Sequence, residues 1–586
     1  MTDPQDFLDQ LHVELAGLDA EPERSAGLDR RHFMFLSLVS AAATTFGTAR
    51  VARAQGRPAA QTPQQPPLPL GNGEPPALQF QPYPAGTGAL LEQTVRERGA
   101  AAFDRVPFEA EAWTGAVPTD PDDLAFLPAH RLSALIRGRR ISSARLTDIY
   151  LTRLKRLNPT LNCAVTILES EARAEAARAD AEIAAGRYRG PLHGLPYGLK
   201  DLFSVKGAPT TWGAKDFEDR VIDEDAEVAV RLREAGAVLI AKLSTGLFAQ
   251  NDQWFRGRTN NPWNLEQGSS GSSAGPGSAT AAACVAFSIG TETQGSIVSP
   301  SVRNGISALR PTFGRVSRHG GMVLAWSMDR VGPMCRTVED CAMVFSVIHG
   351  VDGKDPSTIT MPFRFDRSVR LDSLRIGVDP AAPPEFVNRL RDLGMRPRDV
   401  GPRPTIPGAV SGLAVEDAAA FDAYVQRKAK EIGLDLANLP EPDPNAGRAP
   451  AGPRAAPTNP MAPADWNPRF VNGRTVRAFD FVQSQRRRYA LIARWAEYLA
   501  DLDMFIAAPT VDVGPTAQTG HPCVVVPYKF DVPQQGRGPN AGPALDLKPQ
   551  PICATIVGAL YADDRILSVA HQFQAATDIH LKRPAL

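Results

Sequence analysis

Short apolar runs that alternate with helical patterns constrain the fold of this chain more than any other feature. Four of these runs are mostly apolar and look like strands that are buried on both faces: residues 195–203, 237–242, 285–289 and 504–508. Such strands belong to sheets that helices cover on both sides. The sequence therefore predicts an α/β fold with a mixed β-sheet core surrounded by α-helices.

The segments before and between these runs show helical periodicity. Apolar residues recur at three- and four-residue spacing over 128–137 and from Ser143 to just before Asn158-Pro159, and 169–185 is rich in Ala, Glu and Arg. These patterns predict three helices, the second capped by Ser143.

Composition excludes several functional classes. Of the 586 residues, 43% are hydrophobic, which is enough to bury a large core. Lys+Arg and Asp+Glu both number 64, so a nucleic-acid binder with a bulk basic field is not expected. The six cysteines form no C-x-x-C pair and the nine histidines form no H-x-x-x-H cluster, so no metal site is predicted.

Residues 1–54 have the order of an export signal. Arg30-Arg31 precedes an uncharged stretch over 33–49, and Ala52-Arg53-Ala54 has A-x-A form. This arrangement is similar to a twin-arginine signal, and it predicts cleavage after Ala54 and a periplasmic location. The alternative is a buried first helix with a chance arginine pair, which the acidic residues before Arg30 favour. The stretch is too short and too weakly apolar for a membrane span, and no other segment resembles one.

Proline-rich segments divide the rest of the chain. Residues 55–127 are expected to form an N-terminal arm or linker, and 128–586 a domain with a proline-rich insert at about 438–470. A further Pro/Gly-rich stretch covers 532–551. The two later segments are either inert loops or a rim over a pocket, and both interpretations stay open.

Three segments contain the residues with chemical potential. Residues 193–201 end in Lys200-Asp201, and a lysine at the end of a buried strand loses solvation, which favours its neutral, basic form. A snorkelling surface lysine is the alternative. Residues 268–278 form a Gly/Ser tract that leads into an Ala-rich run. Residues 290–300 pass from a strand into a tight turn that ends in a serine, and successive backbone N–H groups in such a turn can stabilise an oxyanion.

Together these segments resemble the amidase signature family. The family places a lysine on a G-x-P-x-x-x-K-D strand, then a serine in a Gly/Ser loop, then a second serine twenty-four residues later in a G-T-D-T-G-G-S-I turn. Lys200, Ser272 and Ser296 fit this spacing, whereas Ser269 lies twenty-seven residues before Ser296. Further matching motifs include Asn261-Pro262-Trp263, residues 309–317, 328–340 and 519–527. The resemblance covers about 128–584 and implies the amidase-signature fold.

The resemblance also implies roles for these residues. Ser296 is expected to be the nucleophile and Ser272, in a cis peptide in the family, to bridge it to the base Lys200. The backbone N–H groups of Thr293, Gln294, Gly295 and Ser296 are expected to form the oxyanion hole, and Ser273 either supports Lys200 or serves the loop. No metal or organic cofactor is expected.

The expected function is therefore that of an exported amidase acting on a small-molecule amide. Two alternatives stay open. One is a component that supplies ammonia to a partner, as in the related amidotransferases; the other is a non-catalytic binding homologue. The family also includes fatty acid amide hydrolase-like enzymes. The sequence identifies neither the amide nor the oligomeric state, and it leaves open whether the chain forms a homodimer.

Three residues in the turn at 290–300 differ from the family pattern. Gln294 replaces a glycine, Glu292 replaces Asp, and Val298 stands where many members have arginine. Val298 cannot pair with a carboxylate, so we expect a preference for neutral or apolar acyl amides and little glutaminase activity. The alternative is that the arginine only supports structure and that Val298 repacks its space.

Overall fold

The computed structural model describes residues 86–408, 410–437, 439, 468–509, 513–534 and 545–586. The chain divides into two units, Met1–Pro69 and Leu70–Leu586, and all described residues belong to the second. The predicted export signal and most of the predicted insert at 438–470 lie outside the described residues.

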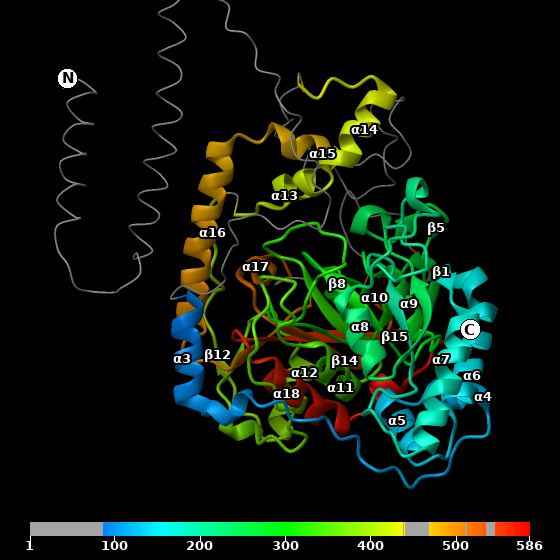
Figure 1. The fold of residues 1–586 in the computed structure, drawn as a ribbon. Coiled ribbons are helices and arrows are strands. Elements are labelled where there is room, and N and C mark those ends of the chain that lie inside the picture. Colours follow the sequence, from blue (N-terminus) through cyan, green and yellow to red (C-terminus); the bar gives the residue numbers. More distant parts are fainter. Residues whose placement is uncertain (1–85, 409, 438, 440–467, 510–512, 535–544) are drawn as a thin grey trace, which may run out of the picture. The chain divides into compact units, whose positions relative to one another are not determined.

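A mixed sheet of eleven strands forms the centre of the described unit (Figure 1), in the order β1-β3-β2-β8-β10-β9-β14-β15-β13-β11-β12. β2 is parallel to β3 and β8, whereas β14 is antiparallel to β9 and β15. The strands are β1 Ala164–Ile167, β2 Pro196–Lys200, β3 Val238–Leu243, β8 Phe287–Glu292, β9 Ser307–Arg310, β10 Arg330–Cys335, β11 Ile376–Val378, β12 Arg398–Asp399, β13 Met504–Ala507, β14 Cys523–Asp531 and β15 Gln550–Gly558. Two small hairpins, β4 Gln253–Trp254 with β5 Gly257–Arg258 and β6 Asn260–Asn261 with β7 Asn264–Gly268, lie outside this sheet.

Helices surround the sheet, as the sequence predicts. They are α3 Gly86–Arg98, α4 Pro121–Ala125, α5 Ala129–Arg137, α6 Ser143–Leu161, α7 Glu169–Ala184, α8 Glu227–Glu234, α9 Ala274–Ala281, α10 Val298–Asn304, α11 Val338–Ile348, α12 Pro384–Asp392, α13 Leu413–Ala420, α14 Asp422–Ile432, α15 Pro468–Asn472, α16 Ala478–Tyr498, α17 Val513–Thr519 and α18 Asp563–Ala575. Among the described residues, none of these helices is long and apolar enough to cross a membrane.

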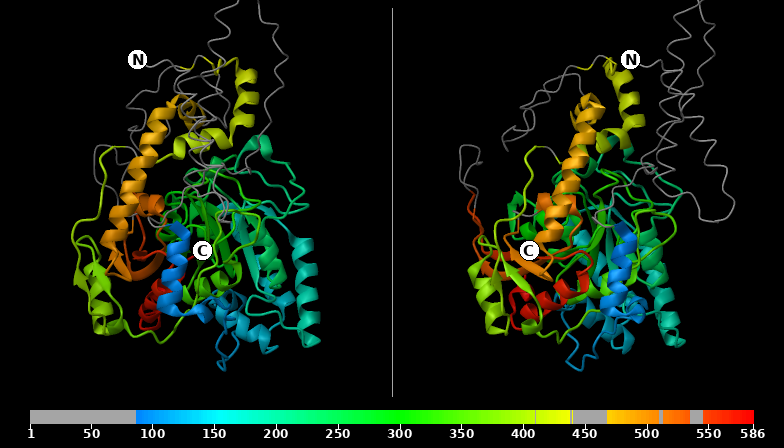
Figure 2. Two further views of the ribbon diagram at one scale, coloured as in Figure 1. Left: turned by 60° about the vertical axis from the view of Figure 1, so that its left-hand side comes forward. Right: turned by 90° about the vertical axis from the view of Figure 1, so that its left-hand side faces the viewer.

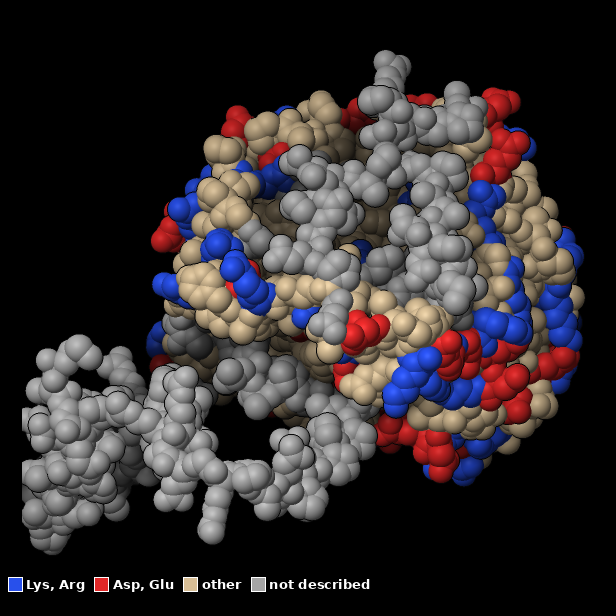
Figure 3. Space-filling model, turned by 90° about the horizontal axis from the view of Figure 1, so that it is seen from above, with Lys and Arg blue, Asp and Glu red and all other residues tan. Residues whose placement is uncertain are grey.

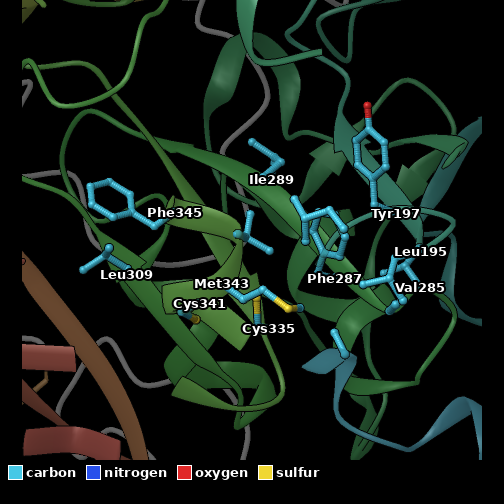
Figure 4. Close-up of a cluster of buried hydrophobic side chains, with 14 of the residues drawn as sticks. Leu195, Tyr197, Val285, Phe287, Ile289, Leu309, Cys335, Cys341, Met343 and Phe345 are labelled. Atoms are coloured by element: carbon cyan, nitrogen blue, oxygen red, sulfur yellow. The ribbon is translucent and has the colours of Figure 1, made fainter. Parts of the chain in front are cut away.

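Side chains alternate between the two faces of the central strands, and each face is covered by helices. On β10, Met334 packs in one cluster with Ala281 of α9, while Cys335 belongs to the main core with Val344 and Phe345 of α11. Figure 4 shows part of this main core, in which Phe345 and Cys335 lie among other buried apolar side chains. Burial on both faces explains why the central strands are mostly apolar and do not alternate regularly between apolar and polar residues.

The four predicted strands correspond to β2, β3, β8 and β13, and α5 and α7 confirm two of the predicted helices. The predicted end of the helix that begins at Ser143 is wrong. α6 continues through Pro159 to Leu161, and Asn162, with a left-handed backbone (φ 50°), ends it. A proline this close to the end removes only one backbone donor, so the helix tolerates it. Ser142, not Ser143, caps the first turn.

Two of the predicted loop or linker segments contain regular structure. The described part of the arm, 86–127, contains α3 and α4, and the stretch predicted at 532–551 ends inside β15.

A second apolar cluster joins α13–α15 to loops of the sheet's first half. It includes Phe421, Tyr424 and Phe470 from these helices and Leu202 and Phe248 from the loops. Both Figure 1 and Figure 2 show α13, α14 and α15 on one side of the sheet. Figure 3 views this side from above and shows a hollow in it, with basic and acidic side chains interspersed around the visible surface.

Candidate active site

Lys200 is the last residue of β2, and its side chain is fully buried. Its Nζ atom lies within hydrogen-bonding distance of two hydroxyl oxygens, Ser272 Oγ at 2.8 Å and Thr291 Oγ1 at 2.8 Å. The structure thus brings together two of the three side chains that the sequence singles out, and it adds the hydroxyl of Thr291.

The surroundings of Lys200 favour its neutral form. Burial lowers the pKa of Lys200 well below its usual value, while the negative charges of Asp329 and Glu292 act in the opposite direction. Burial dominates because an ammonium loses more solvation than two hydroxyl groups restore. A neutral amine in this position can accept a proton from the Ser272 hydroxyl.

Ser272 follows a cis peptide bond to Gly271 and is almost completely buried. A β-carbon on residue 271 would lie 1.8 Å from the carbonyl oxygen of Asn251, so only glycine fits. The rival serine, Ser269, is also buried, but its Oγ donates to the neighbouring carbonyl of Ser270 (3.1 Å). Among the described residues, the serine that contacts Lys200 is therefore the one that the twenty-four-residue spacing predicts.

The turn after β8 is held against the Gly/Ser loop. The backbone N–H of Ser273 donates to the carbonyl of Ser296 (3.2 Å). Ser296 is buried, with 9% of its surface exposed. Within the described parts of the chain, the backbone N–H groups of residues 293–296 donate to no protein acceptor. They remain available to a developing negative charge.

The turn accommodates Gln294 in place of the family glycine because only the next position, Gly295, requires a glycine. Gly295 has φ +96°, and a β-carbon there would lie 2.9 Å from Val513 Cγ1. Gln294, which replaces a family glycine, is exposed, so its side chain points out of the turn. The backbone donors are unaffected by this replacement.

Ser273 contacts the strand beside Lys200 but not Lys200 itself. Its Oγ donates to the carbonyl of Thr291 (3.1 Å) and accepts from the N–H of the same residue (3.2 Å). Ser273 therefore fixes the strand that carries the Thr291 hydroxyl.

Glu292 anchors the turn from below. Its fully buried carboxylate accepts from the backbone N–H groups of Ile297 (2.8 Å) and Val298 (2.9 Å) and pairs with Arg310 Nη1 at 3.0 Å. Burial alone would raise the pKa of Glu292, but Arg310 and the two amides bring it below its usual value. The carboxylate thus stays charged and holds the start of α10 against the turn.

Asp329 anchors the same turn from the side. Its Oδ1 accepts from Thr293 Oγ1 (2.6 Å), and its Oδ2 accepts from the backbone N–H groups of Leu324 (2.8 Å) and Ala325 (3.0 Å). Asp329 and Thr291 lie within the motifs that match the family, but sequence reasoning assigned neither of them a role. The signal that could have identified them is their position: Thr291 lies near the end of β8, and Asp329 directly precedes β10, which pairs with β8.

Val298 is fully buried, in a cluster with Trp495, Phe505 and Val525. Its side chain therefore fills space between α10, α16 and the sheet. This placement favours the packing alternative over a direct contact with substrate.

The match to known proteins agrees with this geometry. The family model described as Amidase matches residues 145–522. The chain belongs to the amidase signature family. The A chain of the glutamyl-tRNA(Gln) amidotransferase from Methylococcus capsulatus is 32% identical over 489 residues, which cover 78% of this chain and 98% of that protein. Its counterpart from Halorhodospira halophila is 33% identical over 495 residues, or 77% and 98%.

Solved amidase structures share the fold. The native peptide amidase from Stenotrophomonas maltophilia aligns with a TM-score of 0.62 and 26% identity, over 78% of this chain and 98% of that one. The predicted family and fold class are thereby confirmed, and the amidase family membership supports an amide-hydrolysing enzyme. In the described part of this amidase, no group of three or more His, Cys, Asp or Glu side chains could hold a metal ion.

The Glu292–Arg310 pair generates a stability prediction. Glu292→Gln leaves the Arg310 guanidinium buried without its counter-charge, so we expect the free energy of unfolding to fall by about 3–5 kcal/mol. Urea unfolding followed by circular dichroism measures this change. The double variant Glu292→Gln/Arg310→Met removes the orphaned charge and is expected to recover part of the loss. Equal destabilisation of the single and double variants would contradict the proposed pairing.

Proposed function

We propose that this chain is an amidase that hydrolyses a carboxylic amide to an acid and ammonia or an amine, with Ser296 as nucleophile and Lys200 as base through Ser272. The observation that carries the proposal is the buried contact between Lys200 Nζ and Ser272 Oγ (2.8 Å). A lysine without a carboxylate partner, surrounded by hydroxyl groups, serves proton transfer better than it serves stability.

The proposed reaction has two stages. In the first, neutral Lys200 accepts a proton from Ser272 while donating to Thr291, Ser272 takes the proton of Ser296, and Ser296 Oγ attacks the amide carbon. The N–H groups of residues 293–296 stabilise the oxyanion, and the tetrahedral intermediate expels the amine, which takes the proton back from Lys200. In the second stage, water attacks the acyl-enzyme by the same proton route and releases the acid.

Two anchors keep the oxyanion donors in place. Glu292 binds the amides that follow the turn, and Asp329 binds the Thr293 hydroxyl within it. Loss of one well-placed donor costs about 10²–10³ in turnover for enzymes of this type. We therefore treat Glu292 and Asp329 as positioning residues.

A second candidate function is that of an amidotransferase component that supplies ammonia to a partner. The names of the two relatives above favour it, because both belong to glutamyl-tRNA(Gln) amidotransferases. Val298, being buried, no longer argues against glutamine. An assay of the purified chain alone, with simple amides and with glutamine, separates these candidates. An amidase acts on simple amides without a partner, whereas an amidotransferase component acts on glutamine and not on simple amides. A non-catalytic homologue acts on neither.

We also propose that residues 1–54 direct export by the twin-arginine route. The arginine pair and the A-x-A sequence support it. Export would separate the protein from cytoplasmic aminoacyl-tRNA, so it favours the stand-alone amidase.

The first functional prediction concerns the serines. Ser296→Ala should abolish hydrolysis, and Ser272→Ala should reduce kcat by at least about a hundredfold, because it interrupts the proton route. Ser269→Ala is the matched control in the same loop and should retain activity within about threefold. Steady-state kinetics on a simple amide, with circular dichroism to verify folding, measures all three. If Ser269→Ala were damaging and Ser272→Ala harmless, the assignment would be wrong.

The second functional prediction concerns the pH dependence of the reaction. Lys200 must be neutral to act, so kcat/KM should rise with pH through its lowered pKa and level off above it. Asp329→Asn removes a negative charge that raises the pKa of Lys200. The rising limb should therefore move to lower pH in this variant, besides any loss of rate. Asp399→Asn, on the exposed edge strand β12, is the control and should leave the limb in place. A shift to higher pH in Asp329→Asn would contradict this mechanism.

The third functional prediction concerns export of the protein. Residues 1–54 fused to a folded reporter should carry it to the periplasm, and Arg30→Lys with Arg31→Lys should retain it in the cytoplasm. Cell fractionation and N-terminal sequencing test this, with Gln55 as the expected first residue. A native protein that keeps Met1 and fractionates with the cytosol would disprove the signal.

A further inference from the structure

A cavity of about 360 Å³ lies next to the strand end that carries Lys200. Leu202, which lines it, follows Lys200 by two residues, so their Cα atoms are no more than about 7 Å apart. The backbone N–H of Met322 donates to the carbonyl of Leu202 (3.1 Å), and Met322 and Val323 line the cavity as well. The cavity therefore lies beside the segment that follows the proposed base, although Lys200 is not among the residues that line it.

Asp329 connects the segment that carries Met322, Val323 and Trp326 to the oxyanion turn. These three residues line the cavity, and the two residues between them, Leu324 and Ala325, donate their backbone N–H groups to Asp329 Oδ2. The other oxygen of the same carboxylate accepts from Thr293 Oγ1. One side chain thus fixes the distance between the cavity and the turn that would hold the substrate carbonyl.

The apolar part of the lining is held rigidly. It includes Leu202, Trp212, Met322, Val323 and Trp326. The Trp212 ring makes edge contacts with Phe217 (5.4 Å between centroids) and Phe421 (5.8 Å), and the Arg220 guanidinium lies 3.8 Å from its centroid. A wall fixed by these contacts needs little reordering to bind a ligand.

The charged groups around the cavity are already neutralised. Arg318 pairs with Asp355 (2.8 Å), His319 lies 2.9 Å from Glu224, and Lys354 pairs with Glu227 (2.8 Å). The lining therefore offers apolar surface beside these pairs, and an ionic ligand would have to disrupt an existing pair.

The volume fits a ring-sized group. A cavity of about 150 Å³ accommodates benzene, and binding pockets for small molecules begin at about 300 Å³. An aromatic ring with a short linker to the reacting carbonyl therefore fits in this space.

We propose that the cavity bounded by Leu202, Trp212, Met322, Val323 and Trp326 is a substrate subsite that binds a neutral aromatic or large aliphatic group of the amide, and that Asp329 aligns this subsite with the oxyanion turn. The inference rests on the proposed function, and it narrows the substrate to amides with a bulky, uncharged substituent near the reacting carbonyl.

The test compares 3-phenylpropionamide with propionamide, which share the reacting group and differ by the ring. The parent should show at least a tenfold higher kcat/KM for the phenyl compound. Val323→Trp, which fills the cavity, and Trp326→Ala, which removes a wall, should each lower this ratio at least tenfold, mainly through KM. Val482→Trp, at an exposed position on α16, is the control for an added indole and should leave the ratio unchanged.

A binding measurement without turnover distinguishes a failure of the proposed subsite from a failure of the proposed function. Calorimetry with the Ser296→Ala variant should detect 3-phenylpropionamide and not propionamide, and adding Val323→Trp should weaken binding at least tenfold. Melting temperatures establish that each variant folds. Equal loss for both amides in the cavity variants, or undiminished binding after Val323→Trp, would overturn the subsite. Absence of hydrolysis by the parent, with ring-dependent binding intact, would instead contradict the proposed function alone.

Discussion

The burial of one amine determines how the rest of the site is built. Lys200 ends a strand that is covered on both faces, and its Nζ meets two hydroxyl oxygens instead of a carboxylate. Burial therefore lowers its pKa, because desolvation disfavours the charged amine. The neighbouring Asp201 has a different partner: it pairs with the buried Lys242 at 2.8 Å. Two adjacent residues of one motif thus differ in their partners: Lys200, the proposed base, contacts hydroxyl groups, and Asp201 forms a buried ion pair.

The turn that faces this amine is supported from two directions. Glu292 connects it to Arg310 in the sheet, and Asp329 connects it to the 322–326 segment beside the cavity. Both carboxylates bind backbone N–H groups outside residues 293–296. Under the proposed function, the N–H groups inside the turn would bind the substrate carbonyl, and a substituent in the proposed subsite would contact the segment that Asp329 holds. The proposal thus links recognition of the substituent to alignment of the carbonyl without a conformational change.

Features that depend on local sequence were predictable, and features that depend on distant segments were not. The apolar runs predict the buried strands because strands that are buried on both faces are composed mainly of apolar residues. The spacing between the serines favours Ser272, which contacts Lys200, over Ser269. The end of α6 was missed because a proline near a helix end costs a single donor. The sequence leaves open whether Val298 contacts substrate or repacks the space of the family arginine, because its packing partners Trp495 and Val525 lie about two hundred residues away in sequence. The cavity could not be predicted for the same reason, since several separate segments form its walls.

The central claim is that the acyl group of the substrate passes through Ser296. Mass spectrometry of the protein, quenched in acid during turnover of an activated anilide, tests this claim most directly. We predict a mass increase equal to the acyl group on the peptide that contains Ser296, and no increase in Ser296→Ala. An acyl group on any other residue, or turnover that continues in Ser296→Ala, would contradict it.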